Sequence, residues 1–204
     1  MRKVLNDVEF FAHLSELFVQ EGASTLTVSD IASRLRCSRR RLYDIAATKD
    51  DLFCLVVRRF LAGVLEEAET WISRAQDPKE ALAAYLDIGV RAAGRVSAAF
   101  LRDVDALEPA RAAFDDYQRL RAARLCQLID EGVKQGVFVK CHGQVVSEIV
   151  LGAAMRLRTH AFLTQSNLTI EEAFQELYRV LLGGLLSERH KHRSSRIGIE
   201  SHVA

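Results

Sequence analysis

Hydrophobic residues recur three or four positions apart along most of the chain. In the first segment this spacing places a set of large apolar side chains on a single helix face. The members of that face are Val4, Val8, Phe11, Leu14 and Phe18. Helical spacing and capping residues together predict about nine helices, at residues 4–20, 28–35, 39–43, 48–75, 78–94, 97–107, 109–135, 144–164 and 169–187.

Polar residues mark the starts of three of these helices. Thr27 and Thr48 each precede an aspartate by three positions, which is the spacing of an N-terminal capping box. Ser38 has the same capping chemistry directly before the third helix. The chain therefore begins with one longer helix and two short ones, and a much longer helix starts at Thr48.

The composition agrees with an all-α fold. Two prolines and eleven glycines among 204 residues are too few turn formers for a sandwich or barrel of short strands. With 49% hydrophobic residues, the chain has enough apolar material for a sizeable core. There is no signal-peptide core, no apolar run approaches the roughly 18 residues of a membrane span, and the four cysteines lack CxxC spacing. We expect a cytoplasmic protein with reduced thiols and without a metal or cofactor.

The charges are distributed unevenly along the chain. The net charge of +1 argues against a protein that coats nucleic acid through bulk charge. Residues 34–49, however, contain six basic side chains and the single acid Asp44, a net charge of +5. The rest of the chain is slightly acidic. An arginine run is often only a solvated helix face. Its position in the fold therefore decides whether it is interpreted as a binding surface.

The arginine run falls within a predicted helix-turn-helix. Two short helices joined by residues 36–37 and preceded by a longer helix have the layout of that motif. In such a unit the N-terminal residues of the second short helix meet base edges in the major groove of DNA. Those residues are Arg39, Arg40 and Arg41. An arginine fork bonds both acceptors of guanine and also pairs with phosphate, so this position favours DNA binding.

The residues of this unit resemble the DNA-binding signature of TetR-type (TetR/AcrR) transcriptional regulators. The matching stretches are residues 27–32, 37–38, 42–43 and 48–52. The resemblance covers roughly residues 1–60, and the remainder is similar only in length and helical pattern. The chain departs from the family at Arg36, where a turn glycine is usual, and at Ala46, where an aromatic residue is usual.

The resemblance implies an all-α protein of two domains. Residues 1–48 would form a three-helix helix-turn-helix DNA-binding domain, and residues 49–188 a larger helical domain for effector binding and dimerisation. Residues 189–204 are polar and lack an apolar period, so we expect a disordered tail there. The last two helices, rich in small and branched apolar residues, would either close the core or pair with a second copy, and the resemblance favours the pairing.

The resemblance also implies roles for individual residues in DNA binding. Thr27 would cap the second helix and contact a phosphate, and Ser38 would cap the recognition helix. Tyr43 and Lys49 would meet the DNA backbone. Arg39 and Arg40 would read bases, and Arg41 would contact either a base or a phosphate.

A small-molecule pocket is expected within residues 49–143, mostly apolar with a few polar groups. Helical spacing does not separate the wall of a cavity from a filled core, so each candidate is also a plausible core or surface residue. The candidates are the bulky Trp71, Tyr85, Phe100, Phe114 and Tyr117 and the polar Arg102, Asp103 and His160.

Three functions compete on the sequence alone. An enzyme is disfavoured because the chain lacks the phosphate-loop, dinucleotide, HExxH and GxSxG motifs, and no histidine follows a glutamate by three positions. A helical dimer that binds only protein partners leaves the arginine run unexplained. The favoured hypothesis is a homodimeric repressor that binds a palindromic operator and is released by a small-molecule effector.

Overall fold

The computed structural model describes residues 7–185, and all regular secondary structure in this part of the chain is helical. Its ten α-helices are α1 (Asp7–Glu21), α2 (Val28–Arg34), α3 (Arg39–Ile45), α4 (Lys49–Ile72), α5 (Pro78–Arg95), α6 (Ala98–Ala106), α7 (Glu108–Lys134), α8 (Gly143–Leu157), α9 (His160–Ser166) and α10 (Ile170–Leu185). The all-α prediction is confirmed. The predicted tail at 189–204 lies outside the described residues.

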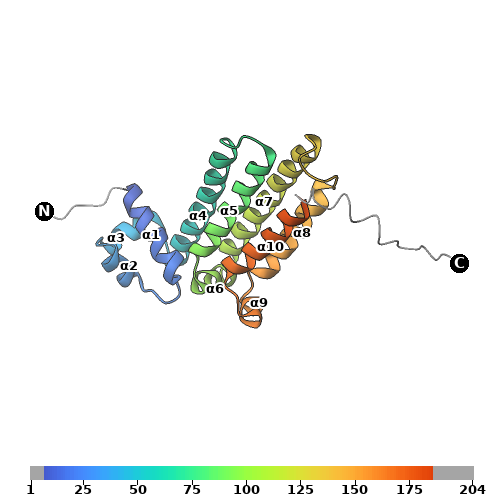
Figure 1. Cartoon of the computed structure of the whole chain (residues 1–204). Helices are drawn as coiled ribbons and strands as arrows, with labels where there is room; N and C mark the ends of the chain where they lie inside the picture. Colours follow the sequence, from blue (N-terminus) through green and yellow to red (C-terminus); the bar gives the residue numbers. More distant parts are fainter. Residues whose placement is uncertain (1–6, 186–204) are drawn as a thin grey trace.

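The described helices form two lobes (Figure 1). Helices α1–α3 make a small lobe at one end, and α5, α7, α8 and α10 lie side by side in the larger body. The long helix α4 belongs to both, because it contacts α1 at one end and packs along α5 and α7. No helix in the described part is long and apolar enough to cross a membrane.

The turn between α2 and α3 has the backbone conformation that glycine favours, although position 36 is an arginine. Arg36 has φ 52, in the left-handed region that residues with a side chain rarely adopt. Its N–H donates to Ser33 O at 3.1 Å, and the N–H of Cys37 donates to Ala32 O at 2.9 Å. These two bonds form a Schellman motif, which satisfies the last carbonyls of α2. Ala46 is half-buried at the C-cap of α3.

One predicted helix is divided in two. The sequence predicts a continuous helix over 144–164, whereas α8 ends at Leu157 and α9 starts at His160. Thr159 adopts an extended conformation and caps α9, its hydroxyl accepting the N–H of Phe162. Beside it, Arg158 is buried and bonds Asp105 at 2.6 Å and Asp115 at 3.1 Å. The break between α8 and α9 was not predicted because the helical spacing of apolar residues continues through it.

A row of phenylalanines joins the two lobes inside one continuous core. Phe18 of α1 packs edge-on against Phe53 of α4, with ring centroids 5.6 Å apart. Phe53 contacts Phe100 of α6 at 5.4 Å, and Phe100 contacts Phe60 of α4 at 6.0 Å. The orientation of the small lobe is therefore set by packing against α4 and α6, not by a flexible linker.

Candidate nucleic-acid interface

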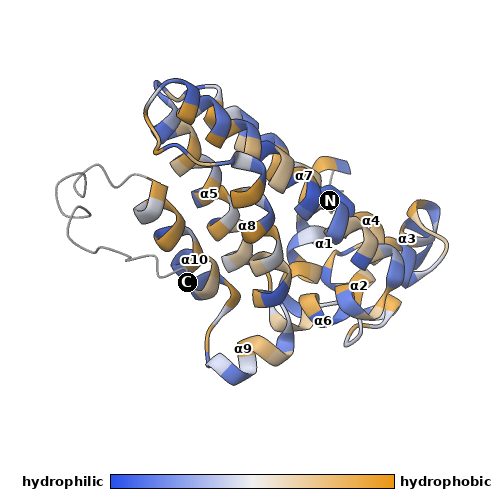
Figure 2. Ribbon diagram, turned by 90° about the vertical axis from the view of Figure 1, so that its right-hand side faces the viewer, coloured by the Kyte–Doolittle hydropathy of each residue, from blue (hydrophilic) through white to orange (hydrophobic). Residues whose placement is uncertain are grey.

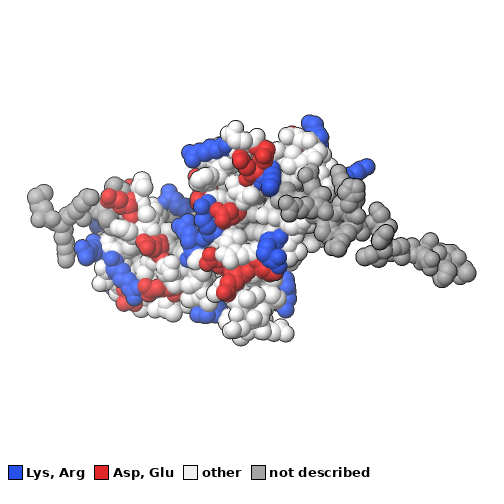
Figure 3. Space-filling view, viewed as in Figure 1, with Lys and Arg blue, Asp and Glu red and all other residues white. Residues whose placement is uncertain are grey.

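The start of α3 presents the predicted recognition residues to solvent. The hydroxyl of Ser38 accepts the backbone N–H of Arg41 at 3.2 Å and so caps the helix. Arg39, Arg40 and Tyr43 are exposed on its surface, Tyr43 by 54%. Figure 3 shows basic side chains at the outer edge of the α1–α3 lobe, with acidic ones beside them. The geometry suits insertion of the first turn of α3 into a groove.

Thr27 caps α2 through a complete capping box. Its hydroxyl and its backbone N–H both donate to the Asp30 carboxylate, at 2.6 Å and 2.9 Å. These bonds lower the pKa of the Asp30 carboxyl, so the cap stays ionised at neutral pH. Thr27 is exposed, and its phosphate contact stays a prediction.

Arg41 differs from the other two arginines of the run. Its guanidinium donates to the Asp7 carboxylate of α1 at 3.0 Å and lies over the ring of Phe10, 4.3 Å from the centroid. These contacts hold α3 against α1. Arg34 likewise pairs with Glu21. Two of the six basic side chains in the run are thus bound to acids of α1, which leaves Arg39 and Arg40 as the exposed pair at the tip of α3.

The loop between α1 and α2 is held from both sides by charged groups. The Lys49 ammonium, at the start of α4, donates to Ala23 O at 2.7 Å and Leu26 O at 2.9 Å. On the other side, the Asp103 carboxylate of α6 accepts the N–H groups of Ala23 at 2.5 Å and Ser24 at 2.9 Å. The loop therefore ties the α1–α3 lobe to α4 and α6. Two of the three donors of Lys49 are engaged in these bonds, and its contact with the DNA backbone stays a prediction.

Gly22 makes the close approach of Asp103 possible. It has φ +73, and a Cβ there would lie 2.5 Å from the Asp103 carboxylate and 3.1 Å from the backbone of Ala99. The sequence suggests Asp103 as a polar anchor in an effector pocket. The structure instead places its carboxylate on the α1–α2 loop.

Replacing Asp103 with alanine is expected to destabilise the protein by about 2–5 kcal/mol, because two backbone N–H groups in a buried or half-buried position lose a charged acceptor. Chemical denaturation measures the change in the free energy of unfolding. Arg102→Ala is the matched control, since Arg102 is exposed on the same helix. Equal stability of the two variants would show that the loop does not depend on Asp103.

The other pocket candidates divide between core and surface. Tyr85, Phe100, Phe114 and Tyr117 are buried, whereas Arg102 and His160 are exposed and Trp71 is 44% exposed. The structure brings Tyr85, Phe114 and Tyr117 to two neighbouring cavities, places Phe100 against Phe53 and Phe60, and does not bring the polar candidates to them.

Two small cavities lie among the helices of the body, and they involve residues absent from the candidate set. One, of about 30 Å³, is bounded by α4, α5, α7 and α10, and the other, of about 10 Å³, by α5, α7, α8 and α10. Tyr85 lines the smaller cavity, and Phe114 and Tyr117 the larger. The buried polar residues Gln118 and Arg121 line both, and Tyr178 lines the smaller. Helical spacing places Gln118 and Arg121 on the same face of α7 as Phe114, but nothing in the sequence separates them from polar surface residues.

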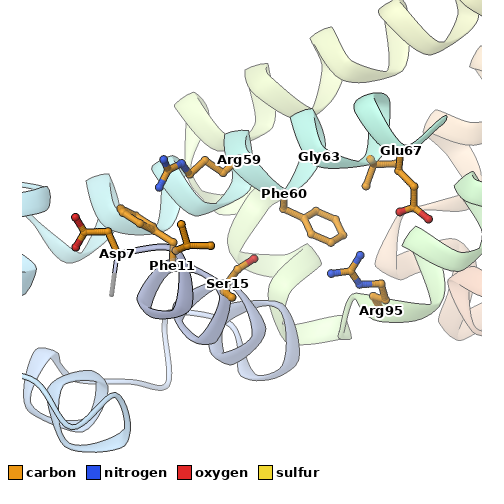
Figure 4. A pocket seen from close by; sticks show the side chains of 11 residues that line it. Asp7, Phe11, Ser15, Arg59, Phe60, Gly63, Glu67 and Arg95 are labelled. Atoms are coloured by element: carbon orange, nitrogen blue, oxygen red, sulfur yellow. The ribbon is translucent and has the colours of Figure 1, made fainter. Parts of the chain in front are cut away.

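A larger hollow, of about 590 Å³, lies on the surface between α1 and α4 (Figure 4). Phe11 and Phe60 form part of its floor. Arg59 covers the ring of Phe11 at 3.9 Å, and Arg95 lies over Phe60 at 5.1 Å. Because the groove is open to solvent and its arginines are exposed, it lacks the enclosed apolar walls of a small-molecule site.

The described residues have the architecture of a helix-turn-helix unit attached to a larger helical body. The sequence matches no protein-family model and no curated protein. Among solved structures, 70 chains match the fold. The structural neighbours over most of the chain are transcriptional regulators, not enzymes.

The neighbours assign the fold to the TetR/AcrR type. PfmR, a TetR-family regulator of Thermus thermophilus, is 22% identical, with 86% of this chain and 97% of PfmR covered and a TM-score of 0.60. A TetR/AcrR-family regulator of Thermobifida fusca is 22% identical, with coverages of 88% and 98% and a TM-score of 0.64. A proposed regulator of Saccharomonospora viridis, solved in complex with choline, is 16% identical, with coverages of 87% and 95% and a TM-score of 0.68. At these identities the likeness establishes the fold.

Proposed function

We propose that the chain is a cytoplasmic transcriptional repressor that binds a palindromic DNA operator as a homodimer and is released by a small-molecule effector. The observation that carries the proposal is the exposed pair Arg39 and Arg40 at the capped N-terminus of α3, within a TetR-like fold. Two guanidinium forks at this position match the acceptor pattern of guanine in the major groove.

The dimer is supported by an apolar surface on α8 and α10. Val145 and Ile149 of α8 are 55% and 64% exposed, and Val180 of α10 is 60% exposed. Figure 2 looks onto these two helices and has hydrophobic residues on both. Pairing with the same surface of a second copy would bury these side chains and place two α3 helices on successive major grooves.

Release by an effector is supported by the continuity between the body and the α1–α3 lobe. A shift of α4 would reach α1 through the packed phenylalanines and reach the α1–α2 loop through Lys49. The effector must favour the non-binding arrangement by a few kcal/mol, because equal affinity for both arrangements shifts nothing.

The proposal is tested by selecting bound sequences from a pool of random duplex DNA with the full-length protein. We expect enrichment of an inverted repeat whose half-sites lie about one helical turn apart, and a specific complex in gel shifts at fixed salt. If no sequence is enriched and binding is uniform or absent, the protein is not an operator-binding regulator and a protein-interaction role takes its place.

A further inference from the structure

Arg121 of α7 is buried in the body without a carboxylate partner. Its residue exposure is 8%, and its guanidinium donates to the Tyr117 hydroxyl and to the backbone oxygen of Tyr85, both at 3.2 Å. No acidic side chain in residues 7–185 pairs with it, and none lines the adjoining cavities. An arginine has five N–H donors, so three remain without an acceptor among these residues. A buried charge in this condition is unfavourable.

The other deeply buried arginine shows what a structural role looks like in this protein. Arg158 is 7% exposed and is held by two carboxylates, those of Asp105 and Asp115. Its positive charge is thus neutralised inside the fold. Arg121 has the same burial and no such acids, which makes it the exception.

The tyrosines around Arg121 do not provide the missing negative charge. Burial raises the pKa of Tyr85 and of Tyr178, more than the nearby Arg121 lowers it. Their hydroxyls are therefore neutral at physiological pH. The ring of Tyr85 contributes a cation–π contact, with its centroid 4.7 Å from the guanidinium carbon.

Two further polar residues that are largely buried border the same cavities. The side-chain amide of Gln118 and the hydroxyl of Tyr178, in residues 6% and 5% exposed, make no hydrogen bond to any residue of 7–185. Both residues line the smaller cavity with Arg121, and Gln118 also lines the larger. In the described residues, the Nε of Arg158 is the one fully buried side-chain nitrogen or oxygen without a partner, so the Gln118 amide and the Tyr178 hydroxyl keep some access to the cavities. There they lie beside the spare donors of Arg121, where a ligand can satisfy them.

We propose that this cluster binds the carboxylate of an organic acid with an apolar body. The guanidinium fork of Arg121 matches the two carboxylate oxygens, and the Gln118 amide and Tyr178 hydroxyl lie within the same cluster as further donors. The remaining walls are apolar and include Phe60, Phe114 and Phe174 on one side and Leu86, Leu125 and Val150 on the other. A cationic ligand such as choline is disfavoured by the charge of Arg121.

The cluster is built so that a ligand must move helices. The two cavities hold about 30 and 10 Å³, no more than about one water molecule, so an organic acid must separate the walls. Phe60 and Leu61 of α4 line the larger cavity, and the guanidinium lies so close to Gly89 of α5 that a Cβ there would overlap it. Widening this cavity displaces α4. The role of the acid as effector rests on the proposed function of the protein. The binding of the acid to this cluster does not depend on that function.

Thermal unfolding of the full-length protein, without DNA, tests the binding. The probes are aliphatic carboxylates from butanoate to octanoate, the alcohols of the same chain lengths, and choline, all at matched ionic strength. A carboxylate at about 100 times its dissociation constant is expected to raise Tm by about 5–10 °C. Calorimetric titration should give one carboxylate per chain, and the alcohols and choline should raise Tm far less.

Three variants assign the effect to the cluster. Arg121→Gln and Arg121→Met should lose the carboxylate response, and the methionine variant should unfold without ligand at the same or a higher temperature, because an unpaired buried charge is gone. Arg119→Gln, an exposed arginine of the same helix, is the control and should respond like the parent.

The proposal is overturned if no carboxylate raises Tm, if the alcohols or choline raise it as much, or if the Arg121 variants respond like the parent. Its failure is distinct from failure of the regulatory function. If the protein responds specifically to carboxylates but selects no DNA sequence, only the proposed repressor function is contradicted. If it binds an operator but does not respond to carboxylates, only the proposed carboxylate site is contradicted.

Discussion

Alanine at both Arg39 and Arg40 should abolish discrimination between operator and random DNA while leaving the fold intact. Each lost bidentate guanine contact costs about 1–3 kcal/mol, and a dimer loses each contact twice, so we expect operator affinity to fall at least about a thousandfold. Both side chains are exposed, and neither has an ion pair in the described residues, so their removal leaves the core unchanged. Gel-shift titration at fixed salt measures the ratio of operator to random-DNA affinity.

The matched control is the double change Arg111→Ala and Arg119→Ala, which removes the same charge from exposed positions on α7. It should retain the preference for the operator. If Arg39→Ala/Arg40→Ala lowers binding to all sequences alike and keeps the preference, the pair contacts phosphates and the sequence is read elsewhere. If the operator affinity is unchanged, α3 is not part of the DNA interface.

Local chemistry accounts for what could be predicted from the sequence. The starts of α2, α3 and α4 depend on caps that lie within three residues, so Thr27, Ser38 and Thr48 are enough to identify them. The same local comparison identified Arg36 as standing where a turn glycine is usual, and the structure shows the left-handed backbone there. Contacts between residues far apart in the sequence have no comparable local pattern from which they could be predicted.

Those distant contacts are where the structure adds most. Asp103 meets the α1–α2 loop about 80 residues away in sequence, and Arg41 meets Asp7 at a separation of 34. Periodicity placed Asp103 on α6 but gave no indication of its partner. The polar members of the core cluster, Gln118 and Arg121, lay on a predicted helix face, yet as polar residues they were indistinguishable from the solvated side of that helix.

The surface formed by α8 and α10 is the second place where a small change should have a large effect. Arginine at both Ile149 and Val180 would put charges into the apolar face proposed to pair with a second copy. The buried centre of an interface tolerates unpaired charge poorly, so we expect a monomer near 22.9 kDa in place of a dimer of twice that mass. Sedimentation equilibrium measures the mass, and circular dichroism checks that the helices remain.

Loss of the dimer should also weaken operator binding by at least about a thousandfold, because a monomer contacts one half-site and a dimer contacts two. Leu120→Arg is the control, since Leu120 is 58% exposed on α7, outside the proposed face. It should leave mass and affinity unchanged. A double variant that stays dimeric would place the interface elsewhere, whereas a monomer that binds the operator as tightly as the parent would show that each copy reads DNA alone.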